Sequence, residues 1–285
     1  MCPILILMAL LQFRFLKPLL LKHGRWHYRR ISKVIAYVFY KSAVQVLPQF
    51  WLGFSSLFSA SVFYYDAMYQ VYNVMYTSTP ILVVAVFDQD VGAAMALRTP
   101  QLYSDGRFGA HHSTVLFWMW IGEGVVHSIF LTYVPMLSVG YGEVLADGCA
   151  AGLYDIGIIV FFTVVLTVTV RLAFDLRMVT KLSSFFMIIS IFAWVCTWVY
   201  ASDSETLRAK GFGQINGSFA MKSGDTLFWA TVLLASVLCA LTSIAREAIH
   251  SCFAPTPALV AREIEKAETH GTRNVQIQPR VQPEV

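Results

Sequence analysis

The chain has 285 residues, of which 57% are hydrophobic, 14% aromatic and only 13% charged, and its formal net charge is +4. One water-soluble core of this length cannot hide so much apolar surface, so the composition excludes an ordinary soluble domain. It indicates a protein that crosses a membrane several times, and no nucleic-acid partner is predicted.

The N-terminal region begins with a short apolar run at residues 4–11, and its basic residues follow that run. This run is too short to cross a membrane, and a secretory signal would carry its basic residues first. We therefore expect residues 1–33 to form a basic cytosolic segment and not a signal or a span.

Six long windows with few charged residues follow. A helix rises about 1.5 Å per residue and the hydrocarbon core is about 30 Å thick, so roughly 20 apolar residues make one crossing. The expected fold is therefore an all-α integral membrane protein with six transmembrane helices. The expected spans are residues 36–57, 68–87, 114–135, 152–171, 182–201 and 226–245.

Only residues 58–67 separate the first two spans, which predicts a tight hairpin. Lys and Arg near span ends stay on the cytosolic side of the membrane. They gather before the first span, after the second, after the fourth and after the sixth, so both termini are expected in the cytosol. The outer loop at 202–225 contains Asn216 in an Asn-Gly-Ser tripeptide, a glycosylation candidate on the side where glycosylation occurs.

Beyond the last span the chain loses hydrophobicity and gains charge and proline. We expect a short helix near residues 258–268, followed by a disordered tail. The expected domain organisation is thus a basic segment at 1–33, a six-span transmembrane domain at 34–250 and a cytosolic, largely disordered tail at 251–285.

Motifs for chemistry are missing from the sequence. The cysteines form no CxxC pair or ligand cluster, and there is no GxxxxGK[ST] phosphate loop, HExxH or GxSxG. No metal site and no catalytic residue are predicted, and the chain by itself is not expected to hydrolyse ATP.

Lys41 lies inside the first expected span. It is about 12 Å along the helix from Lys33 at about 1.5 Å per residue, near enough to the cytosolic face for its ammonium to snorkel to headgroups. A span that began at Ser42 instead would leave only Asp66 to turn the chain. We therefore expect Lys41 inside the membrane, where a cation is costly enough to indicate a function.

In the second expected span, Asn73 and Pro80 lie about two helical turns apart on nearly the same face. Pro80 removes one helix hydrogen bond and exposes a carbonyl near Ser78 and Thr79, which predicts a kink lined by small polar groups. A packing kink, with Asn73 bonded to a neighbouring helix, remains the other interpretation.

Glu123 and His127 share one face of the third expected span, at positions i and i+4. Two buried polar groups that satisfy one another are a more common arrangement than a proton relay. We therefore interpret this pair as structural.

Segments 12–42 and 72–91, together with 99–106, resemble the C-terminal membrane half of the type IV P-type ATPases, the phospholipid flippases. The strings HGRW, FYK and FDQDV carry the resemblance most specifically. It runs from residue 12 to about 250, in the order and spacing of that family's last six spans. The later spans match mainly in hydropathy and loop length.

The resemblance implies roles for particular residues. The lysine of FYK lies next to the path of the lipid headgroup in that family, where an ammonium suits phosphate or carboxylate. The residue after it is usually asparagine, whereas this chain has Ser42. The implied lipid-pathway residues are Lys41, Ser42, Asn73, Ser78 and Pro80, and Asp88 and Asp90 would form a cytosolic coupling loop.

A complete flippase has four earlier spans, an actuator domain, and phosphorylation and nucleotide-binding domains with a DKTGT motif, none of which is present here. By this resemblance residues 1–33 are the end of a missing phosphorylation domain, and the chain is a truncated product or a separately encoded membrane half. The resemblance implies a phospholipid substrate, ATP and Mg²⁺ for the complete enzyme, a two-span glycosylated accessory β-subunit, and the plasma membrane or a Golgi or endosomal membrane.

Two alternatives stay open from the sequence. One is a non-catalytic membrane subunit or regulator that pairs with a full-length flippase. The other is an unrelated six-span secondary transporter or channel, which should show repeated halves or a polar pore stripe, and neither is found.

Overall fold

The computed structural model describes residues 15–107, 113–139, 152–176, 180–204, 218–253 and 257–269. Every regular element in these ranges is helical, which confirms the all-α fold. The chain divides into a larger unit, residues 30–88 and 111–247, and a smaller unit, residues 1–29, 89–110 and 248–285. The apolar run 4–11, Asn216 and the tail beyond residue 269 lie outside the described residues.

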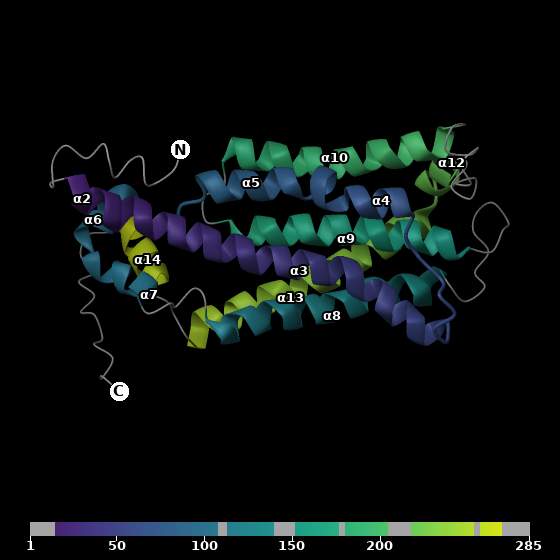
Figure 1. The fold of residues 1–285 in the computed structure, drawn as a ribbon, viewed down its shortest axis with the longest axis horizontal. Coiled ribbons are helices and arrows are strands. Elements are labelled where there is room, and N and C mark those ends of the chain that lie inside the picture. The colour runs from purple at the N-terminus through teal and green to yellow at the C-terminus, as the bar shows by residue number, and fades with distance from the viewer. Residues whose placement is uncertain are drawn as a thin grey trace. The chain divides into compact units, whose positions relative to one another are not determined.

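The larger unit is a bundle of long helices that run side by side (Figure 1). The helix α3 begins in the smaller unit and α13 ends there, and both pass through the bundle. The helices are α3 (Arg25–Ser55), α4 (Asp66–Val71), the π-helical turn η3 (Tyr72–Tyr76), α5 (Ser78–Phe87), α8 (Thr114–Val139), α9 (Leu153–Asp175), α10 (Lys181–Asp203), α12 (Ser218–Ser223) and α13 (Thr226–Phe253).

Five helical segments are long and apolar enough to cross a membrane, and they coincide with the second to sixth expected spans. They are Met68–Phe87, Thr114–Val139, Leu153–Asp175, Lys181–Asp203 and Thr226–Ile249. The first expected span, residues 36–57, lies in α3 up to Ser55, but Lys41, Gln45 and Gln49 make that helix less apolar than the others. Length and apolarity therefore identify five candidate spans in the described residues, one fewer than expected.

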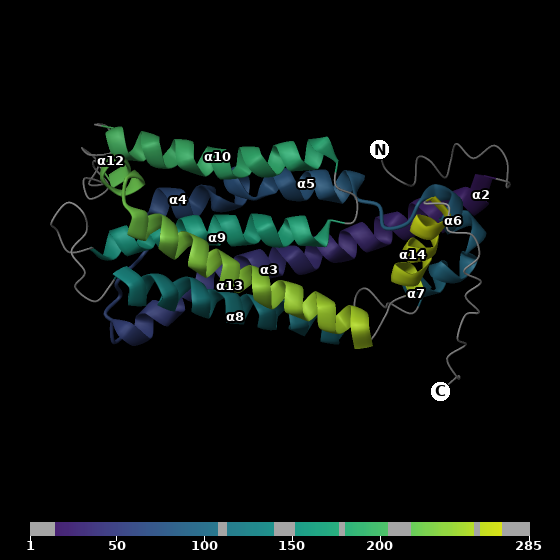
Figure 2. The ribbon, with the colours of Figure 1, turned by 180° about the vertical axis from the view of Figure 1, so that it is seen from behind.

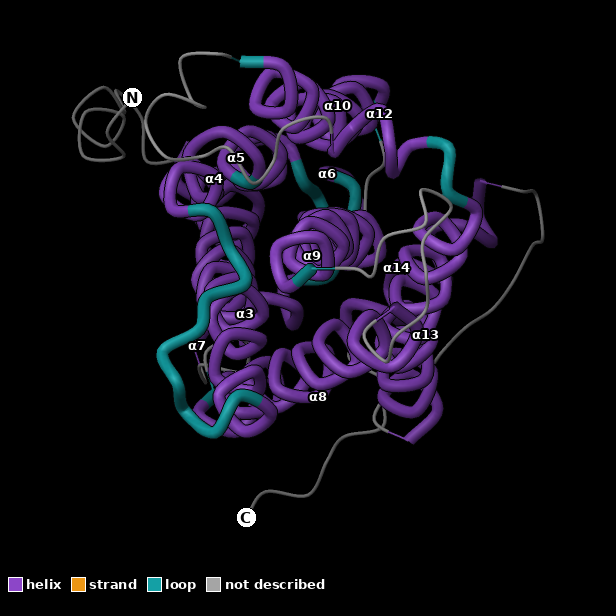
Figure 3. The backbone as a smooth tube through the Cα atoms, turned by 90° about the vertical axis from the view of Figure 1, so that its right-hand side faces the viewer, coloured by secondary structure: helices purple, strands orange, loops and turns teal. Residues whose placement is uncertain are grey.

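The helix α9 lies at the centre of the bundle. Figure 3 shows it surrounded by α3, α8, α13, α10 and the α4–α5 segment. Its apolar window is 83% buried, against 22–39% for the other four candidate spans. Its sequence explains this place, because no charged residue occurs from 156 to 170 and a helix that is apolar on every side belongs in an interior.

The expected tight connection between the first two spans is present as residues 56–65, between α3 and α4. Its second half is buried in the bundle, with Phe63 at 0% and Tyr64 at 5% exposure. The carbonyl of Phe63 lies so close to Gly157 of α9 that a Cβ there would collide with it. Glycine at this position therefore lets the connection pack directly on the central helix.

The helix α13 lies beside α8 in the bundle, as Figures 2 and 3 both show. Side-chain hydrogen bonds join the pair, and one of them runs from the Ser243 hydroxyl to the Glu123 carboxylate at 2.8 Å. Thr231 donates to Ser138 at 3.0 Å between their hydroxyl oxygens, and His127 lies 2.7 Å from the hydroxyl of Thr242.

The smaller unit has its own apolar core, formed by Val91, Met95, Leu102 and Ala261, against which Ile264 packs. The helix expected near residues 258–268 is confirmed as α14, an amphipathic helix. The elements of this unit, besides the first turn of α3 and the last turn of α13, are α2 (Leu16–Pro18), the π-helical turn η2 (Leu19–Gly24), α6 (Ala93–Arg98), the 3₁₀ turn η4 (Pro100–Tyr103), α7 (Ser104–Arg107) and α14 (Pro257–Thr269).

Candidate functional site

A break in the second candidate span organises the site. The π-helical turn η3 ends at Tyr76, Thr77 leaves the helical conformation with φ −124° and ψ −12°, and α5 begins at Ser78. Pro80 is thus in the first turn of α5 and not at a kink within one continuous helix. Such a position tolerates proline, because the fixed φ of proline suits the first turn of a helix.

Lys41 lies opposite this break. Its side chain is buried, with the residue 5% exposed, and its ammonium donates to the Thr77 hydroxyl at 2.7 Å. The Thr77 hydroxyl in turn donates to the carbonyl of Tyr72 at 3.2 Å, or to that of Asn73 at 3.5 Å. The Tyr72 hydroxyl donates to the carbonyl of Lys41 at 3.4 Å. The lysine and the break are therefore joined by direct hydrogen bonds.

Lys41 forms no ion pair with any carboxylate in the part of the chain that the structure describes. The Thr77 hydroxyl is the one hydrogen-bond partner of its ammonium there. An ammonium group has three N–H donors, and a cation in a water-poor site is stabilised strongly only by an anion or by several acceptors. The ammonium thus keeps donors that phosphate or carboxylate oxygens would suit chemically.

The other residues of the expected lipid pathway have different surroundings. The hydroxyl of Ser42 donates to the carbonyl of Val38 at 2.9 Å, and that of Ser78 donates to the carbonyl of Val74 in η3, so each bonds to the backbone four positions earlier. Asn73 is exposed whereas Pro80 is buried. The structure thus brings Lys41 to the break, but it does not place Asn73 and Pro80 in one environment.

Thr77 was missed in the sequence analysis. A signal for it exists, because threonine is a preferred residue just before a helix and proline is tolerated in the first turn, where Pro80 lies in α5. The sequence does not predict that Lys41 lies beside Thr77, because only the fold brings α3 and α5 together.

A buried charge cluster joins α8, α9 and α13 in the larger unit. Glu123 pairs with Arg171 at 3.0 Å and with Arg246 at 2.8 Å, and Arg171 also pairs with Asp175 at 2.8 Å. The ring of Trp120 lies 4.5 Å from the Arg171 guanidinium and 5.3 Å from that of Arg246. Two carboxylates and two guanidiniums thus balance each other inside the bundle.

The prediction that Glu123 and His127 satisfy one another is wrong, because each has closer partners. The His127 ring nitrogen lies 4.0 Å from the Glu123 carboxylate. Its closer partners are the hydroxyl of Tyr40 at 2.6 Å and that of Thr242 at 2.7 Å. Both polar groups are satisfied, but by other helices, because these approach closer than the neighbouring turn does.

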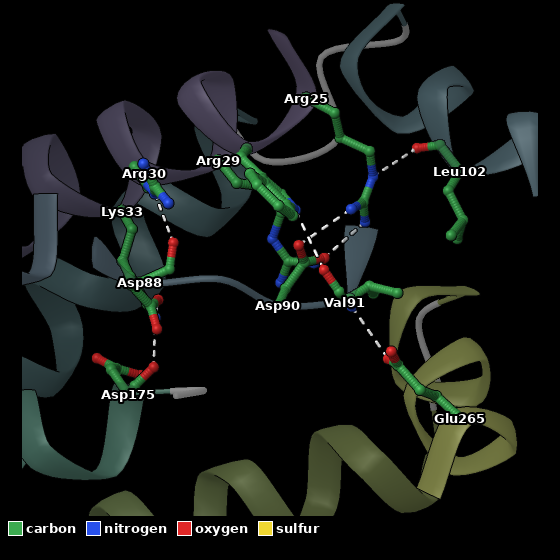
Figure 4. Close-up of polar contacts among 12 residues, drawn as sticks. Arg25, Arg29, Arg30, Lys33, Asp88, Asp90, Val91, Leu102, Asp175 and Glu265 are labelled. Atoms are coloured by element: carbon green, nitrogen blue, oxygen red, sulfur yellow. Dashed lines mark hydrogen bonds and ion pairs between the residues drawn. The ribbon is translucent and has the colours of Figure 1, made fainter. Parts of the chain in front are cut away.

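Asp88, in the larger unit, directly follows α5 and is 8% exposed. Lys33 lies 3.0 Å from its carboxylate and also donates to the carbonyl of Asp175 (Figure 4). The guanidinium of Arg30 donates to the backbone carbonyl of Asp88 at 2.5 Å. The end of α5 is therefore attached to α3 and not left as a solvated turn.

Asp90, in the smaller unit, receives two hydrogen bonds from Arg25, at 3.0 and 2.6 Å, and one from Arg29 at 2.5 Å (Figure 4). Burial raises the pKa of this carboxyl, but the charges of Arg29 and Arg25 outweigh burial and hold the pKa below its ordinary value. The contribution of these pairs to stability is thus present above the ordinary carboxyl pKa and is lost as the pH falls through the lowered one.

The residues directly after Asp90 contact α14. The amide of Gly92 donates to the carboxylate of Glu265 at 3.0 Å, and the indole of Trp26 donates to the carbonyl of Val91 at 3.2 Å. A Cβ at Gly92 would collide with the Glu265 carboxylate, so glycine allows this close approach. Two separate parts of the smaller unit therefore fix the backbone of residues 91–92.

No metal centre was expected. In the described ranges, no three His, Cys, Asp or Glu side chains come together in a way that could hold a metal ion.

Comparison with known proteins gives a family-level result. Residues 8–256 match the family described as phospholipid-translocating P-type ATPase C-terminal. The chain is 30% identical over 92% of its length to phospholipid-transporting ATPase DRS2 of Saccharomyces cerevisiae. It is 31% and 32% identical, over 82% of its length, to the Homo sapiens phospholipid-transporting ATPases ID and IC. It spans 19% of each relative, about a fifth of their length.

Proposed function

Because this chain belongs to the phospholipid-translocating P-type ATPases, as part of their C-terminal membrane region, we propose that it forms the wall along which a phospholipid headgroup moves. In the complete flippase, ATP and Mg²⁺ would drive that movement from the outer to the inner leaflet. The catalytic cytosolic domains are not part of this sequence.

The observation that carries the proposal is the buried ammonium of Lys41, which has one neutral partner in the described residues and no carboxylate. A headgroup phosphate or carboxylate would replace the Thr77 hydroxyl and bring the missing negative charge. The burial of Lys41 by protein supports this role over snorkelling, because a snorkelling ammonium reaches water or headgroups at the membrane surface.

The other residues of the expected lipid pathway would have supporting roles. Asn73 lies on an exposed face with Val74 and Met75, which are 70% and 51% exposed, and would contact the lipid from there. Ser42 follows Lys41 and Ser78 follows Thr77 in the sequence, and both would tune the polarity beside the ammonium. Pro80 would keep the helix open at the break, and Asp88 and Asp90 would link the end of α5 to the phosphorylation domain of the complete enzyme.

We also propose six spans, equivalent to the last six of a P-type ATPase, with α3 as the first. A transport helix that carries a polar site is expected to be less apolar than its neighbours. The domain organisation would then be a basic cytosolic segment at 1–33, the transmembrane domain at 34–250 and a cytosolic tail at 251–285. A two-span accessory β-subunit and a plasma, Golgi or endosomal membrane complete the proposal.

The topology can be tested by cysteine labelling in intact cells. Cysteines introduced at Ser59 and Ser204 should react with an impermeant maleimide from outside, because six spans place both on the outer side. A cysteine at Ser104 should react only after the membrane is permeabilised. Labelling of Ser104 in intact cells would overturn the six-span proposal with both ends in the cytosol.

The transport role can be tested in a chimera. This chain replaces the corresponding C-terminal region of DRS2, and fluorescent phospholipid uptake is measured in cells that lack the endogenous protein. We expect ATP-dependent uptake by the chimera, none by DRS2 truncated before this region, and no phosphoenzyme from the chain alone. A chimera that reaches the membrane and forms phosphoenzyme but moves no phospholipid would refute the role.

A further inference from the structure

The carbonyl of Tyr76 needs a donor that its own helix cannot supply. In a regular helix it would accept from the amide of the residue four positions later, which is Pro80, and proline has no amide hydrogen. Tyr76 is 0% exposed, so water does not reach this residue. A buried carbonyl in a membrane bundle must be satisfied from within the protein.

Ser190 of α10 supplies that donor. Its hydroxyl donates to the carbonyl of Tyr76, and Ser190 is itself 0% exposed. Most other described serine and threonine hydroxyls on the candidate spans donate to their own helices, as Thr163, Ser236 and Thr197 do. Ser190 instead bonds across to the single carbonyl that Pro80 leaves without its helical partner.

The position of that carbonyl matters because Thr77 follows directly. The Tyr76–Thr77 peptide leads out of η3, and its orientation sets where the Thr77 hydroxyl points. That hydroxyl is the partner of Lys41. A group that donates to the Tyr76 carbonyl therefore acts on Lys41 through the Tyr76–Thr77 peptide and the Thr77 side chain.

We propose that Ser190 is a positioning residue, which holds the broken helix in the conformation that presents Thr77 to Lys41. The idea that this arrangement serves a lipid headgroup rests on the proposed function, but the positioning itself does not. The helix α10 thereby takes part in the site although, in the described residues, none of its side chains forms a hydrogen bond or ion pair with Lys41.

The test measures the reactivity of Lys41 in the purified full chain in lipid nanodiscs. The amines are labelled with a small N-hydroxysuccinimide ester, and the rate at Lys41 is divided by the rate at the exposed Lys181 in the same molecules. We expect Ser190→Ala to raise this ratio several-fold, because Thr77 is no longer held against the ammonium. Ser190→Thr, which keeps the hydroxyl, should leave the ratio near the wild-type value.

A matched control and a suppressor sharpen the test. Ser236→Ala removes a hydroxyl that bonds only to its own helix, so it should not change the ratio. Pro80→Ala restores an amide at position 80 that can donate to Tyr76, so adding Ser190→Ala to it should have little further effect. In protein labelled with [1-¹³C]tyrosine, Ser190→Ala alone should shift amide I intensity to higher frequency.

An unchanged Lys41 ratio in Ser190→Ala would overturn the proposal. So would an equal rise with and without Pro80→Ala, since the hydroxyl would then act independently of the freed carbonyl. None of these measurements involves transport. If the ratio rises as expected while Lys41 proves dispensable for uptake by the chimera, the positioning role of Ser190 stands and the proposed headgroup role fails.

Discussion

Replacement of Arg171 by Met should destabilise the chain by about 3–5 kcal/mol, the range for removal of one partner from a buried ion pair. Arg171 pairs with both Glu123 and Asp175, and its side chain is 3% exposed. Its loss leaves the Asp175 carboxylate without a guanidinium, and it leaves Glu123 with Arg246 and the Ser243 hydroxyl. The measurement is equilibrium unfolding in mixed detergent–lipid micelles, followed by tryptophan fluorescence.

Two comparison variants separate charge from packing. The side chain of Arg246 is 22% exposed, so Arg246→Met should cost less than Arg171→Met. The double variant Arg171→Met with Asp175→Leu should recover part of the loss, since no carboxylate is then left uncompensated at position 175. If Arg171→Met proves no more harmful than Arg246→Met, the buried cluster does not stabilise the bundle as its geometry indicates.

The second large effect is expected at Lys41. In the DRS2 chimera, Lys41→Ala should weaken the apparent affinity for anionic phospholipid while insertion and expression stay intact. Insertion should not suffer, because removal of a cation from the membrane relieves a cost of about 2.5–3.5 kcal/mol. The measurement is phospholipid uptake as a function of lipid concentration, compared between anionic and zwitterionic headgroups.

Lys41→Arg tests whether the site is built around an ammonium. The guanidinium keeps the charge but is wider and has a planar set of donors, so a site that fits Lys41 against Thr77 should be impaired by it. Lys181→Ala is the matched control, since Lys181 is exposed at the start of α10. Normal lipid-dependent uptake in both Lys41 variants would rule out a headgroup role for this residue.

The sequence predicts the helices well because each depends on a long local pattern. Windows such as 156–170 are apolar without interruption, and the membrane requires such segments to be helical. Even the central place of α9 has a local signal in that window, which carries no polar face. The burial of Lys41 could also be inferred, since only one placement of the first span leaves room for a turn.

The partners of the buried polar groups could not be predicted in the same way. In the sequence, Arg171 and Arg246 stand at the ends of the fourth and sixth expected spans and indicate only the cytosolic side, yet both pair with Glu123 on another helix. Which side chains meet depends on which helices are neighbours and how they are rotated. No local pattern in a single sequence contains that information.

The break at Thr77 lies between these two cases. Pro80 has no amide hydrogen. The sequence therefore predicts that the carbonyl four positions earlier, that of Tyr76, lacks its usual helical donor. The sequence cannot say that Ser190, more than a hundred positions away, will face it. The sequence therefore predicts that the Tyr76 carbonyl needs a donor from elsewhere, and only the fold identifies Ser190 as that donor.

The central place of α9 also constrains the order of assembly during synthesis. This helix is enclosed by helices that precede it in the chain and by α10 and α13, which follow it, so its burial is completed only after α13 has entered the bilayer. The window 156–170 carries no charge, so most of α9 can remain in contact with lipid until then. Glu123 has no such tolerance, because α8 emerges from the ribosome before either arginine partner. Glu123 thus lacks a guanidinium partner until α9 brings Arg171, and its second partner, Arg246, arrives only with α13.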